Sequence, residues 1–311
     1  SNTGYVKRIP VQAYRKQKRG GKGVTGMTTK EEDFVQRLFV ASSKDYLLIF
    51  SNKGIIRWLK VYEIPVASRQ SKGKAIVNLL SFSNDEQISA IVAVKEFKDD
   101  QFLIMATSGG VVKKTSLSAY SNPRKGGIIG ITLDAKDVLI GVEISDGKKE
   151  VLLATKLGKS LRFKEEQLRE IGRGARGVRG IALASNDQVV GMIVFDADAD
   201  KTGSTLLTGS SLGYAKRSKF DDYRVQSRGG KGIINLKCTS KNGHVVGVLV
   251  VQEDGEVITV TKQGMMIRCN PADVRLTGRS AVGVRLVALD SGDTVASIAN
   301  VVAHEDDAVA E

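Results

Sequence analysis

Cysteine, proline, histidine and aromatic residues are all scarce in this chain of 311 residues. It has 2 Cys, 4 Pro and 2 His, and aromatic residues make up 5%. Two thiols exclude a disulfide-stapled scaffold and indicate a reducing environment. So few prolines, beside 41% apolar residues, exclude an extended disordered chain. The sequence therefore predicts a folded protein with an ample hydrophobic core.

Long apolar runs are also lacking. No run approaches the roughly 18 residues that a membrane span needs, and no basic amphipathic helix is apparent, so we expect no membrane partner. The first residues, Ser1-Asn-Thr-Gly-Tyr5, have neither an initiator Met nor a charged and then apolar leader. We expect a segment cut from a longer protein, located in the cytoplasm.

Patterns that carry catalysis or bind cofactors are absent or incomplete. Cys238 and Cys269 lack metal-ligand spacing, and His244 stands at the entry of a strand pattern, where a structural role is expected. Gly172–Gly177 fits G-x-G-x-x-G, but no helix pattern follows; Gly158-Lys-Ser160 resembles only the end of a phosphate-binding loop. The sequence predicts no catalytic site, no metal and no cofactor in this segment.

What the chain does have is positive charge and a repeat. The formal net charge is +13, which favours a polyanionic partner. One glycine recurs before an apolar tail, at separations of 52, 54, 50, 53 and 53 residues. A second glycine, followed by mostly apolar residues and then a cation, precedes each of these by 17 or 19 residues. The first set is Gly21, Gly73, Gly127, Gly177, Gly230 and Gly283; the second is Gly4, Gly54, Gly110, Gly158, Gly213 and Gly264.

The pattern between these glycines is that of short strands. β-branched runs cover 34–40, 88–94, 189–195 and 245–251, and further runs cover 46–50, 102–105, 151–154, 205–207, 256–260, 55–58 and 265–268. Only 164–170 has a helical pattern, of one or two turns. Six units of about 52 residues, with four strands each, are typical of propeller blades. The sequence predicts a single all-β, six-bladed domain over 1–311, with a short acidic tail at 304–311. We expect 5–9 and 294–302 to share one blade and close the ring, which leaves no open sheet edge.

Charge is segregated within the repeat. Six windows, each from the second-set glycine to the end of the following apolar tail, hold 33 of the 47 Lys and Arg but only 7 of the 34 Asp and Glu. A ring would bring equivalent positions to one basic rim, and duplex DNA is a polyanion that can bend along such a rim. Few Asn, Gln or aromatic residues accompany the cations, so we expect backbone-led binding with little base recognition. The predicted rim cations are Arg15, Lys16, Arg69, Lys72, Lys74, Arg124, Lys125, Arg173, Arg176, Arg179, Arg228, Lys231, Arg279 and Arg285.

One stretch, Gln17-Lys18-Arg19-Gly20-Gly21-Lys22-Gly23, resembles the gyrase box of the C-terminal domains of the bacterial DNA gyrase A protein. The resemblance extends through all six repeats. Lys18 stands where the family usually has Arg, which keeps the charge but loses a bidentate phosphate contact. Gly229-Gly-Lys-Gly232 is nearly a second box.

The resemblance implies a six-bladed β-pinwheel, in which neighbouring blades exchange strands. It implies a domain that wraps duplex DNA with one hand, so that the type II topoisomerase introduces negative supercoils. It also implies a bacterial, nucleoid-associated protein whose partners are the rest of the gyrase A protein and the gyrase B protein, in an A2B2 assembly. The isolated domain would be monomeric and not an enzyme, with ATP and Mg used elsewhere in the assembly.

Two alternatives stay open. The related C-terminal domain of the A-type protein of topoisomerase IV is similar, but it is poor in boxes. A protein-interaction propeller of the WD-repeat kind is the other alternative, although no repeated Trp-Asp pair occurs here.

Overall fold

The computed structural model describes residues 4–10, 41–68, 71–83, 85–263 and 265–301. These residues form an all-β, propeller-like fold of small antiparallel sheets, and their only helices are short 3-10 turns. The strands are β1 (Tyr5–Val6), β2 (Tyr46–Ser51), β3 (Ile55–Lys60), β4 (Lys74–Ala75), β5 (Ile88–Val94), β6 (Phe102–Thr107), β7 (Val111–Ser116), β8 (Ile128–Ile129), β9 (Leu139–Ser145), β10 (Glu150–Thr155), β11 (Lys159–Lys164), β12 (Val178–Arg179), β13 (Val189–Phe195), β14 (Thr205–Ser210), β15 (Tyr214–Ser218), β16 (Ile233–Ile234), β17 (Val245–Val251), β18 (Glu256–Thr261), β19 (Met266–Cys269), β20 (Val284–Arg285) and β21 (Val295–Val301). The 3-10 turns are η2 (Val61–Glu63), η3 (Ile76–Asn78), η4 (Leu117–Tyr120), η5 (Glu165–Gln167), η6 (Ala199–Thr202), η7 (Phe220–Asp222) and η8 (Pro271–Asp273).

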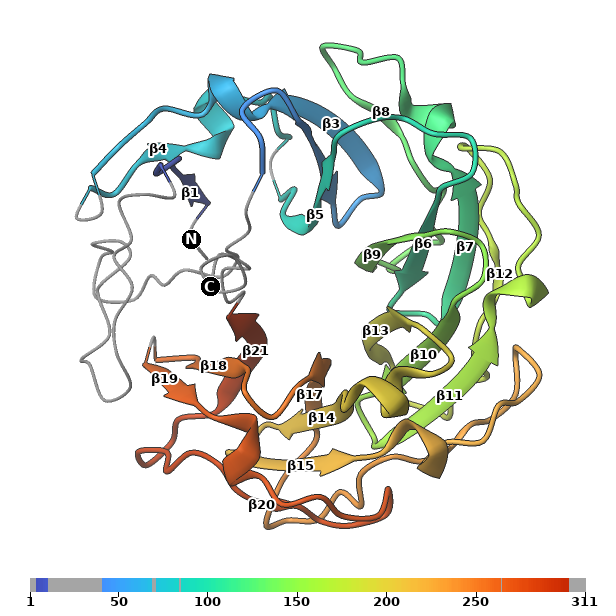
Figure 1. Ribbon diagram of the computed structural model, residues 1–311, viewed down its shortest axis with the longest axis vertical. Coiled ribbons are helices and arrows are strands. Elements are labelled where there is room, and N and C mark those ends of the chain that lie inside the picture. The colour runs from blue at the N-terminus through green and yellow to red at the C-terminus, as the bar shows by residue number, and fades with distance from the viewer. Residues whose placement is uncertain (1–3, 11–40, 69–70, 84, 264, 302–311) are drawn as a thin grey trace, which may run out of the picture.

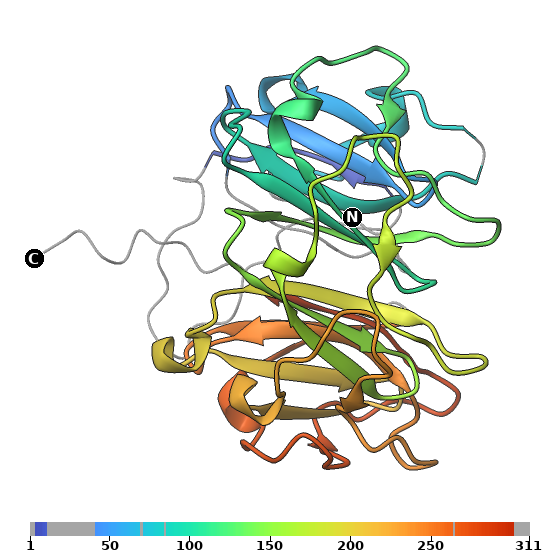
Figure 2. The same cartoon turned by 90° about the vertical axis from the view of Figure 1, so that its right-hand side faces the viewer.

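Five sheets form blades. Four of them have four strands, in the orders β5-β2-β3-β8, β9-β6-β7-β12, β13-β10-β11-β16 and β17-β14-β15-β20, and the fifth is β21-β18-β19. A separate pair joins β1 to β4. Figure 1 shows β5, β9, β13, β17 and β21 around the centre, with β8, β12 and β20 at the outer edge. Seen edge-on, the longer strands run across the thickness and their turns lie on the two faces (Figure 2).

The predicted strands at 88–94, 189–195 and 245–251 are confirmed as the inner strands β5, β13 and β17. The predicted count of six blades is not confirmed, because the described residues form five such sheets and the β1–β4 pair. The predicted strand at 34–40 lies outside the described residues. The predicted sharing of one blade by the two terminal strands is wrong: β21 takes the inner place of the fifth blade beside β18, whereas β1 pairs with β4.

The hydrophobic core lies between neighbouring blades. Leu48 and Phe50 of the first blade pack with Leu103, Met105 and residues of β9 in the second. The middle strands are therefore buried on both faces, and for this reason their sequences are continuous apolar runs rather than alternating ones.

A serine or threonine ends each middle strand at the same place. Ser51, Thr107, Thr155, Ser210 and Thr261 each follow a register shift against the inner strand. In four of the five the hydroxyl accepts the N–H four residues on, as Thr155 Oγ1 does from Lys159 at 3.2 Å; Ser210 instead donates to the Tyr214 carbonyl. This hydroxyl closes the hairpin turn that leads into the outer half of the blade.

Neighbouring repeats exchange strands, as the resemblance implies. The outermost strand of each four-stranded blade has two residues and comes from the following repeat, as β16 does on β11. Two glycines with positive φ make this exchange fit. An ideal Cβ on Gly158 (φ +87°) would lie 2.2 Å from the Leu236 carbonyl oxygen, and one on Gly232 (φ +69°) would lie 2.5 Å from that of Ser160. The Gly158 carbonyl also accepts the N–H groups of Asn235 and Leu236, at 2.8 and 3.1 Å.

The position of Gly232 adjusts the sequence alignment of the repeat. β4, β8, β12 and β20 begin directly after Gly73, Gly127, Gly177 and Gly283, and β16 begins directly after Gly232. The glycine that is structurally equivalent in this copy is therefore Gly232, two residues beyond Gly230, which spacing alone had selected. The helical pattern at 164–170 gives a single turn, η5.

Replacing Gly158 with Ala should destabilise the fold. The left-handed backbone alone costs a side chain about 1–3 kcal/mol, and the Cβ would also press on a backbone carbonyl that cannot move independently. Urea unfolding should show a lower midpoint. Gly278→Ala is the matched control, because nothing lies within 4 Å of its Cβ and its φ is not left-handed; an equal loss in both variants would contradict this account of the strand exchange.

Candidate nucleic-acid interface

The repeated basic segments lie on the outer edge of the blades. We call the segments 121–127, 169–177, 224–232 and 275–283, together with the described part of 65–73, the box loops. Each begins after a 3-10 turn or its cap and ends at the glycine that precedes a two-residue strand. Four of them attach to the preceding repeat in the same way: Ala67 N donates to Arg8 O, Ile171 N to Lys114 O, Gln226 N to Arg162 O and Thr277 N to Arg217 O, at 2.8–3.0 Å.

Successive box loops are joined to one another. We call the two-residue strands β4, β8, β12, β16 and β20 the rim strands. The segment that follows a rim strand donates a backbone N–H to the next box loop. Thr132 N bonds Ala175 O at 3.3 Å, Ala182 N bonds Gly230 O at 2.9 Å, and Lys237 N bonds Ala281 O at 3.2 Å. From 127 to 283 the box loops therefore form one hydrogen-bonded arc along the outer edge.

The loop 121–127 differs from the others. It is shorter than the nine-residue loops 169–177, 224–232 and 275–283, and residues 121–126 are all exposed. The part of the chain that the structure describes contains no backbone hydrogen bond from the segment after β4 to this loop. Its cations Arg124 and Lys125 consequently extend from a segment that only its own turn orders, with Gly127 N donating to Arg124 O at 2.9 Å.

The described rim cations lie in the box loops or in the two-residue strands that follow them. Lys74, Arg124, Lys125, Arg176, Arg179, Lys231 and Arg285 are exposed, whereas Lys72, Arg173, Arg228 and Arg279 are half-buried. The remaining predicted site residues, Arg15, Lys16, Gln17, Lys18, Arg19, Gly20, Gly21, Lys22, Gly23 and Arg69, lie outside the described residues.

Two of the half-buried arginines also form hydrogen bonds to backbone carbonyls of the preceding rim strand. The Arg228 guanidinium donates to the carbonyl of Arg179, and Gly229 N donates to Gly180 O at 2.7 Å. In the next box loop, Arg279 Nη1 donates to Ile234 O at 2.9 Å. Each of these arginines thus links its loop to the preceding rim strand while part of its side chain remains exposed to solvent.

Several cations of the basic windows do not lie on the surface at all. Arg57, Lys113, Lys114, Arg162, Lys216 and Arg217 are buried. Four of them pair with carboxylates: Arg57–Glu86 at 2.5 Å, Lys114–Glu165 at 2.8 Å, Arg162–Glu150 at 2.5 Å and Arg217–Glu253 at 3.0 Å. All of these carboxylates except Glu165 lie outside the windows. Counting charge by sequence window therefore overstated the charge of the rim. Their position, three or four residues after the second-set glycine, is the signal that could have separated them.

The pairing with Arg57 stabilises the charged form of the Glu86 carboxyl. Burial raises the pKa of the Glu86 carboxyl, but hydrogen bonds from Arg57, Ser51 and Ser83, with the Arg57 charge, outweigh this and lower it to about 2. Arg57 and Glu86 share two hydrogen bonds, at 2.5 and 3.0 Å. This pair ties β3 to the turn before β5.

Lys113 and Lys216 are buried without a carboxylate on the ammonium group. Lys113 Nζ donates to Gly130 O at 2.7 Å and to the carbonyl of Arg173, beneath the box loop 169–177. Lys216 Nζ donates to Ser218 Oγ at 2.6 Å and to the Tyr223 hydroxyl at 3.0 Å. Burial, with the charge of Arg173, lowers the pKa of Lys113 to about 8. Burial also lowers the pKa of Lys216 to about 7; the Asp222 charge opposes this shift and the Arg279 charge adds to it.

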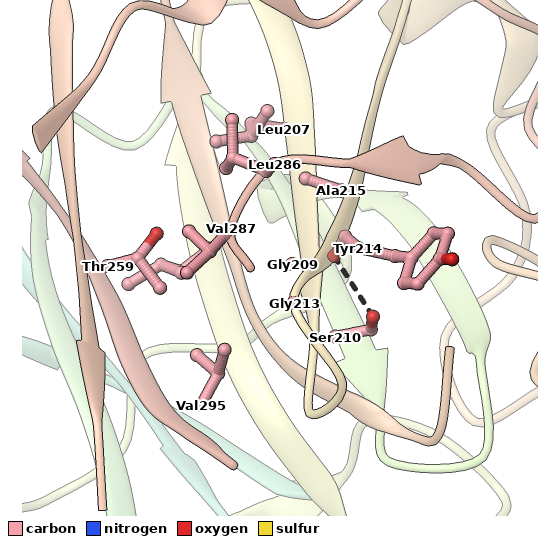
Figure 3. Close-up of a pocket in the computed structure, with 11 residues that line it drawn as sticks. Leu207, Gly209, Ser210, Gly213, Tyr214, Ala215, Thr259, Leu286, Val287 and Val295 are labelled. Atoms are coloured by element: carbon pink, nitrogen blue, oxygen red, sulfur yellow. Dashed lines mark hydrogen bonds between the residues drawn. The ribbon is translucent and has the colours of Figure 1, made fainter. Parts of the chain in front are cut away.

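An apolar pocket lies between the fourth and fifth blades. Figure 3 shows Leu207, Ala215, Thr259 and Val287 among its lining residues, with Ser210 Oγ donating to Tyr214 O at 2.9 Å. No acidic, basic or histidine side chain is among the residues that line it. The pocket is a packing gap between blades, and the polar side chains that line it are the hydroxyls of Ser210, Tyr214 and Thr259.

The described residues contain no group of three or more His, Cys, Asp or Glu arranged to hold a metal ion. They also contain no helix long and apolar enough to cross a membrane.

Comparisons with known proteins match the chain to one family. The chain matches the family described as "DNA gyrase C-terminal domain, beta-propeller" in the segments 1–42, 45–95, 101–146, 149–196, 204–252 and 255–301. It is 41% identical over 307 residues to the DNA gyrase A protein of Salmonella typhimurium, covering 99% of this chain and 34% of that protein. The chain thus spans about a third of the length of that relative.

Two solved structures share the fold. A crystal structure of the C-terminal domain of DNA topoisomerase IV superposes with a TM-score of 0.82 at 25% identity, covering 96% of this chain and 91% of that one. A structure of a DNA gyrase A C-terminal domain gives a TM-score of 0.75 at 26% identity, covering 96% and 97%. The chain therefore shares its overall fold with both kinds of domain.

The lowered pKa of Lys216 predicts a pH dependence. The unfolded chain, in which this amine has its ordinary pKa near 10.4, binds more protons than the folded protein above pH 7. Stability from this group should therefore rise with pH from about 7 to 10, by at most about 1.4 kcal/mol per unit. Lys216→Met should lose that rise relative to the wild type in urea unfolding at pH 7 and 9.5. Lys219→Met, at an exposed neighbour, should keep it; parallel pH profiles for all three proteins would refute the assignment.

Proposed function

Since the chain belongs to the DNA gyrase C-terminal domain family, we propose that it binds duplex DNA along the box loops and bends it into a chiral wrap. The wrap would direct a type II topoisomerase to introduce negative supercoils. The observation that carries this proposal is the hydrogen-bonded arc of box loops, which presents exposed cations on successive blades. Phosphates are the groups that such an arc suits best, because neutralising them releases counterions whatever the base sequence.

We propose further that the domain has six blades. Six consecutive segments match the family. β1 stands where β3, β7, β11 and β15 stand in other repeats, directly after a second-set glycine, and β4 pairs with it as the other rim strands pair with theirs. The β1–β4 pair would then be the outer half of a sixth blade.

The proposed partners are those of the whole gyrase. The chain would act as part of the gyrase A protein, with the gyrase B protein, in an A2B2 assembly in the bacterial cytoplasm. DNA cleavage and ATP hydrolysis, with its Mg, would be carried out elsewhere in that assembly. This division of labour is supported by the relative of which the chain spans about a third.

A topoisomerase IV domain is the second candidate, favoured by its higher TM-score. We prefer gyrase because 41% identity to a gyrase A protein extends over 99% of the chain, and because the sequence contains the stretch Gln17–Gly23. A protein-interaction propeller would not need cations on every box loop.

The proposal is tested by ligating nicked circular DNA with rising amounts of the chain and analysing topoisomers after the protein is removed. We expect a progressive change in linking number, because a chiral wrap is trapped on ligation. Salt-sensitive binding without such a change would leave DNA docking without wrapping. Absence of binding at moderate salt would refute the proposal.

Neutralising the box stretch should separate wrapping from binding. In Lys18→Ala/Arg19→Ala/Lys22→Ala we expect the linking-number change to fall sharply while affinity falls less, since the other box loops still contact phosphates. Topoisomer analysis and fluorescence anisotropy on the same preparations measure the two effects. If neither changes, the assignment of 17–23 as a DNA-binding element is wrong.

A single exposed cation should contribute to the salt dependence. Arg179 is exposed on β12, so Arg179→Ala should weaken binding severalfold and reduce the slope of log K against log salt by about 0.9, the loss of one phosphate contact. Lys201→Ala, in η6 and away from the box loops, is the control. The role given to β12 would be excluded by identical slopes in the wild type and both variants.

A further inference from the structure

One box loop is already paired with a carboxylate of the chain itself. Among the predicted rim cations that the structure describes, Arg176 is the one whose guanidinium is engaged by a carboxylate. Its partner is Asp134, which lies in the preceding repeat, after β8. Both side chains are about half exposed, at 58% and 46%, so the pair faces the same solvent from which a phosphate would arrive.

The two loops are held so that this pair forms. Thr132 N donates to Ala175 O at 3.3 Å, and Thr132 Oγ1 donates to Gly174 O at 2.7 Å. These bonds fix the backbone two residues before Asp134 against the backbone just before Arg176. The carboxylate is thus positioned by the fold and is not a chance contact of two long side chains.

A carboxylate and a phosphate compete for the same guanidinium donors, because both offer paired anionic oxygens to its planar fork. We propose that Asp134 is an internal phosphate competitor, which occupies Arg176 until duplex DNA displaces it. This inference rests on the proposed function and adds a regulatory contact to it.

Within the arc from 127 to 283, the competitor acts on one box loop. Asp134 follows Gly127 by seven residues, and at the same distance after Gly177 and Gly232 stand Ala184 and Thr239; Asp290 has this position after Gly283, at the end of the arc. Neither Ala184 nor Thr239 can hold an arginine, so Lys231 and Arg279 of the following loops have no equivalent carboxylate. The loop 169–177, with Arg169, Arg173 and Arg176, would therefore be the arc that engages DNA last and leaves first as salt rises.

The test uses a labelled linear duplex and the 311-residue chain, with anisotropy titrations at two salt concentrations. Asp134→Asn should tighten binding about two- to fivefold, the range expected for releasing an exposed ion pair. Asp254→Asn, on the exposed turn between β17 and β18, makes the same change in net charge and should have a smaller effect. Thermal midpoints should be alike in both variants, since each changes only an exposed side chain.

A double-mutant cycle separates local competition from general charge. Arg176→Gln should weaken binding, and in that background Asp134→Asn should lose most of its gain, because no guanidinium remains to be released. Equal effects of Asp134→Asn and Asp254→Asn, or full additivity in the cycle, would overturn the inference while leaving the proposed function intact. A wild-type chain that does not bind the duplex would instead refute the proposed function itself.

Discussion

The whole arrangement depends on a close approach between the backbones of consecutive repeats. Gly158 and Gly232 each lie within 2.2–2.5 Å, measured from an ideal Cβ, of a carbonyl oxygen in the other's segment, so no side chain fits at either place. Because of this contact the outer strand of a blade comes from the next repeat, and four of the five blades are completed by a neighbour. Stability then accumulates through nearest-neighbour interfaces, as in other repeat proteins. The same contact sets the box loop on the outer edge, so one constraint serves both the fold and the proposed function.

Arginine in the box loops combines two tasks that lysine could not. Arg228 and Arg279 each use one guanidinium nitrogen to hold a carbonyl of the preceding rim strand. A guanidinium has five N–H donors in a fixed plane. Its other nitrogens can therefore bind an anion while the bond to the carbonyl is kept. An ammonium group placed against the same carbonyl would be drawn toward it and away from solvent, as happens to Lys113 beneath the loop 169–177. The loops are therefore stiffened by residues that also supply their charge.

Much of this fold could be predicted from the sequence, because the inner strands are short apolar runs bounded by turn residues. Ile88–Val94 and Val245–Val251 were predicted to the residue. The predictions failed where the structure depends on contacts between residues that are far apart in the sequence. The partner of a two-residue strand such as β16 is fixed by the glycines that it meets in another repeat, so spacing selected Gly230 in place of Gly232. Burial of Lys113 and Lys216 was missed because a window of charges does not indicate which side of a strand faces the core. The ring closure was wrong for the same reason, since β21 has the seven-residue pattern of an inner strand and pairs as one.

The linked box loops bear on how a duplex would be bent. Smooth bending of a short DNA site costs of order 1–6 kcal/mol, and a protein recovers this through the contacts that the bend permits. A flexible edge would have to be ordered as well, whereas here Ala182–Gly230 and Lys237–Ala281 bonds fix the arc beforehand. A curved track that is already formed leaves the bending energy as the main cost, and it holds the cations at spacings set by the blades. Among the described loops from 121 to 283, the segment 121–126 receives no such bond, so there the path of the DNA would be set by the side chains of Arg124 and Lys125 and not by the fold.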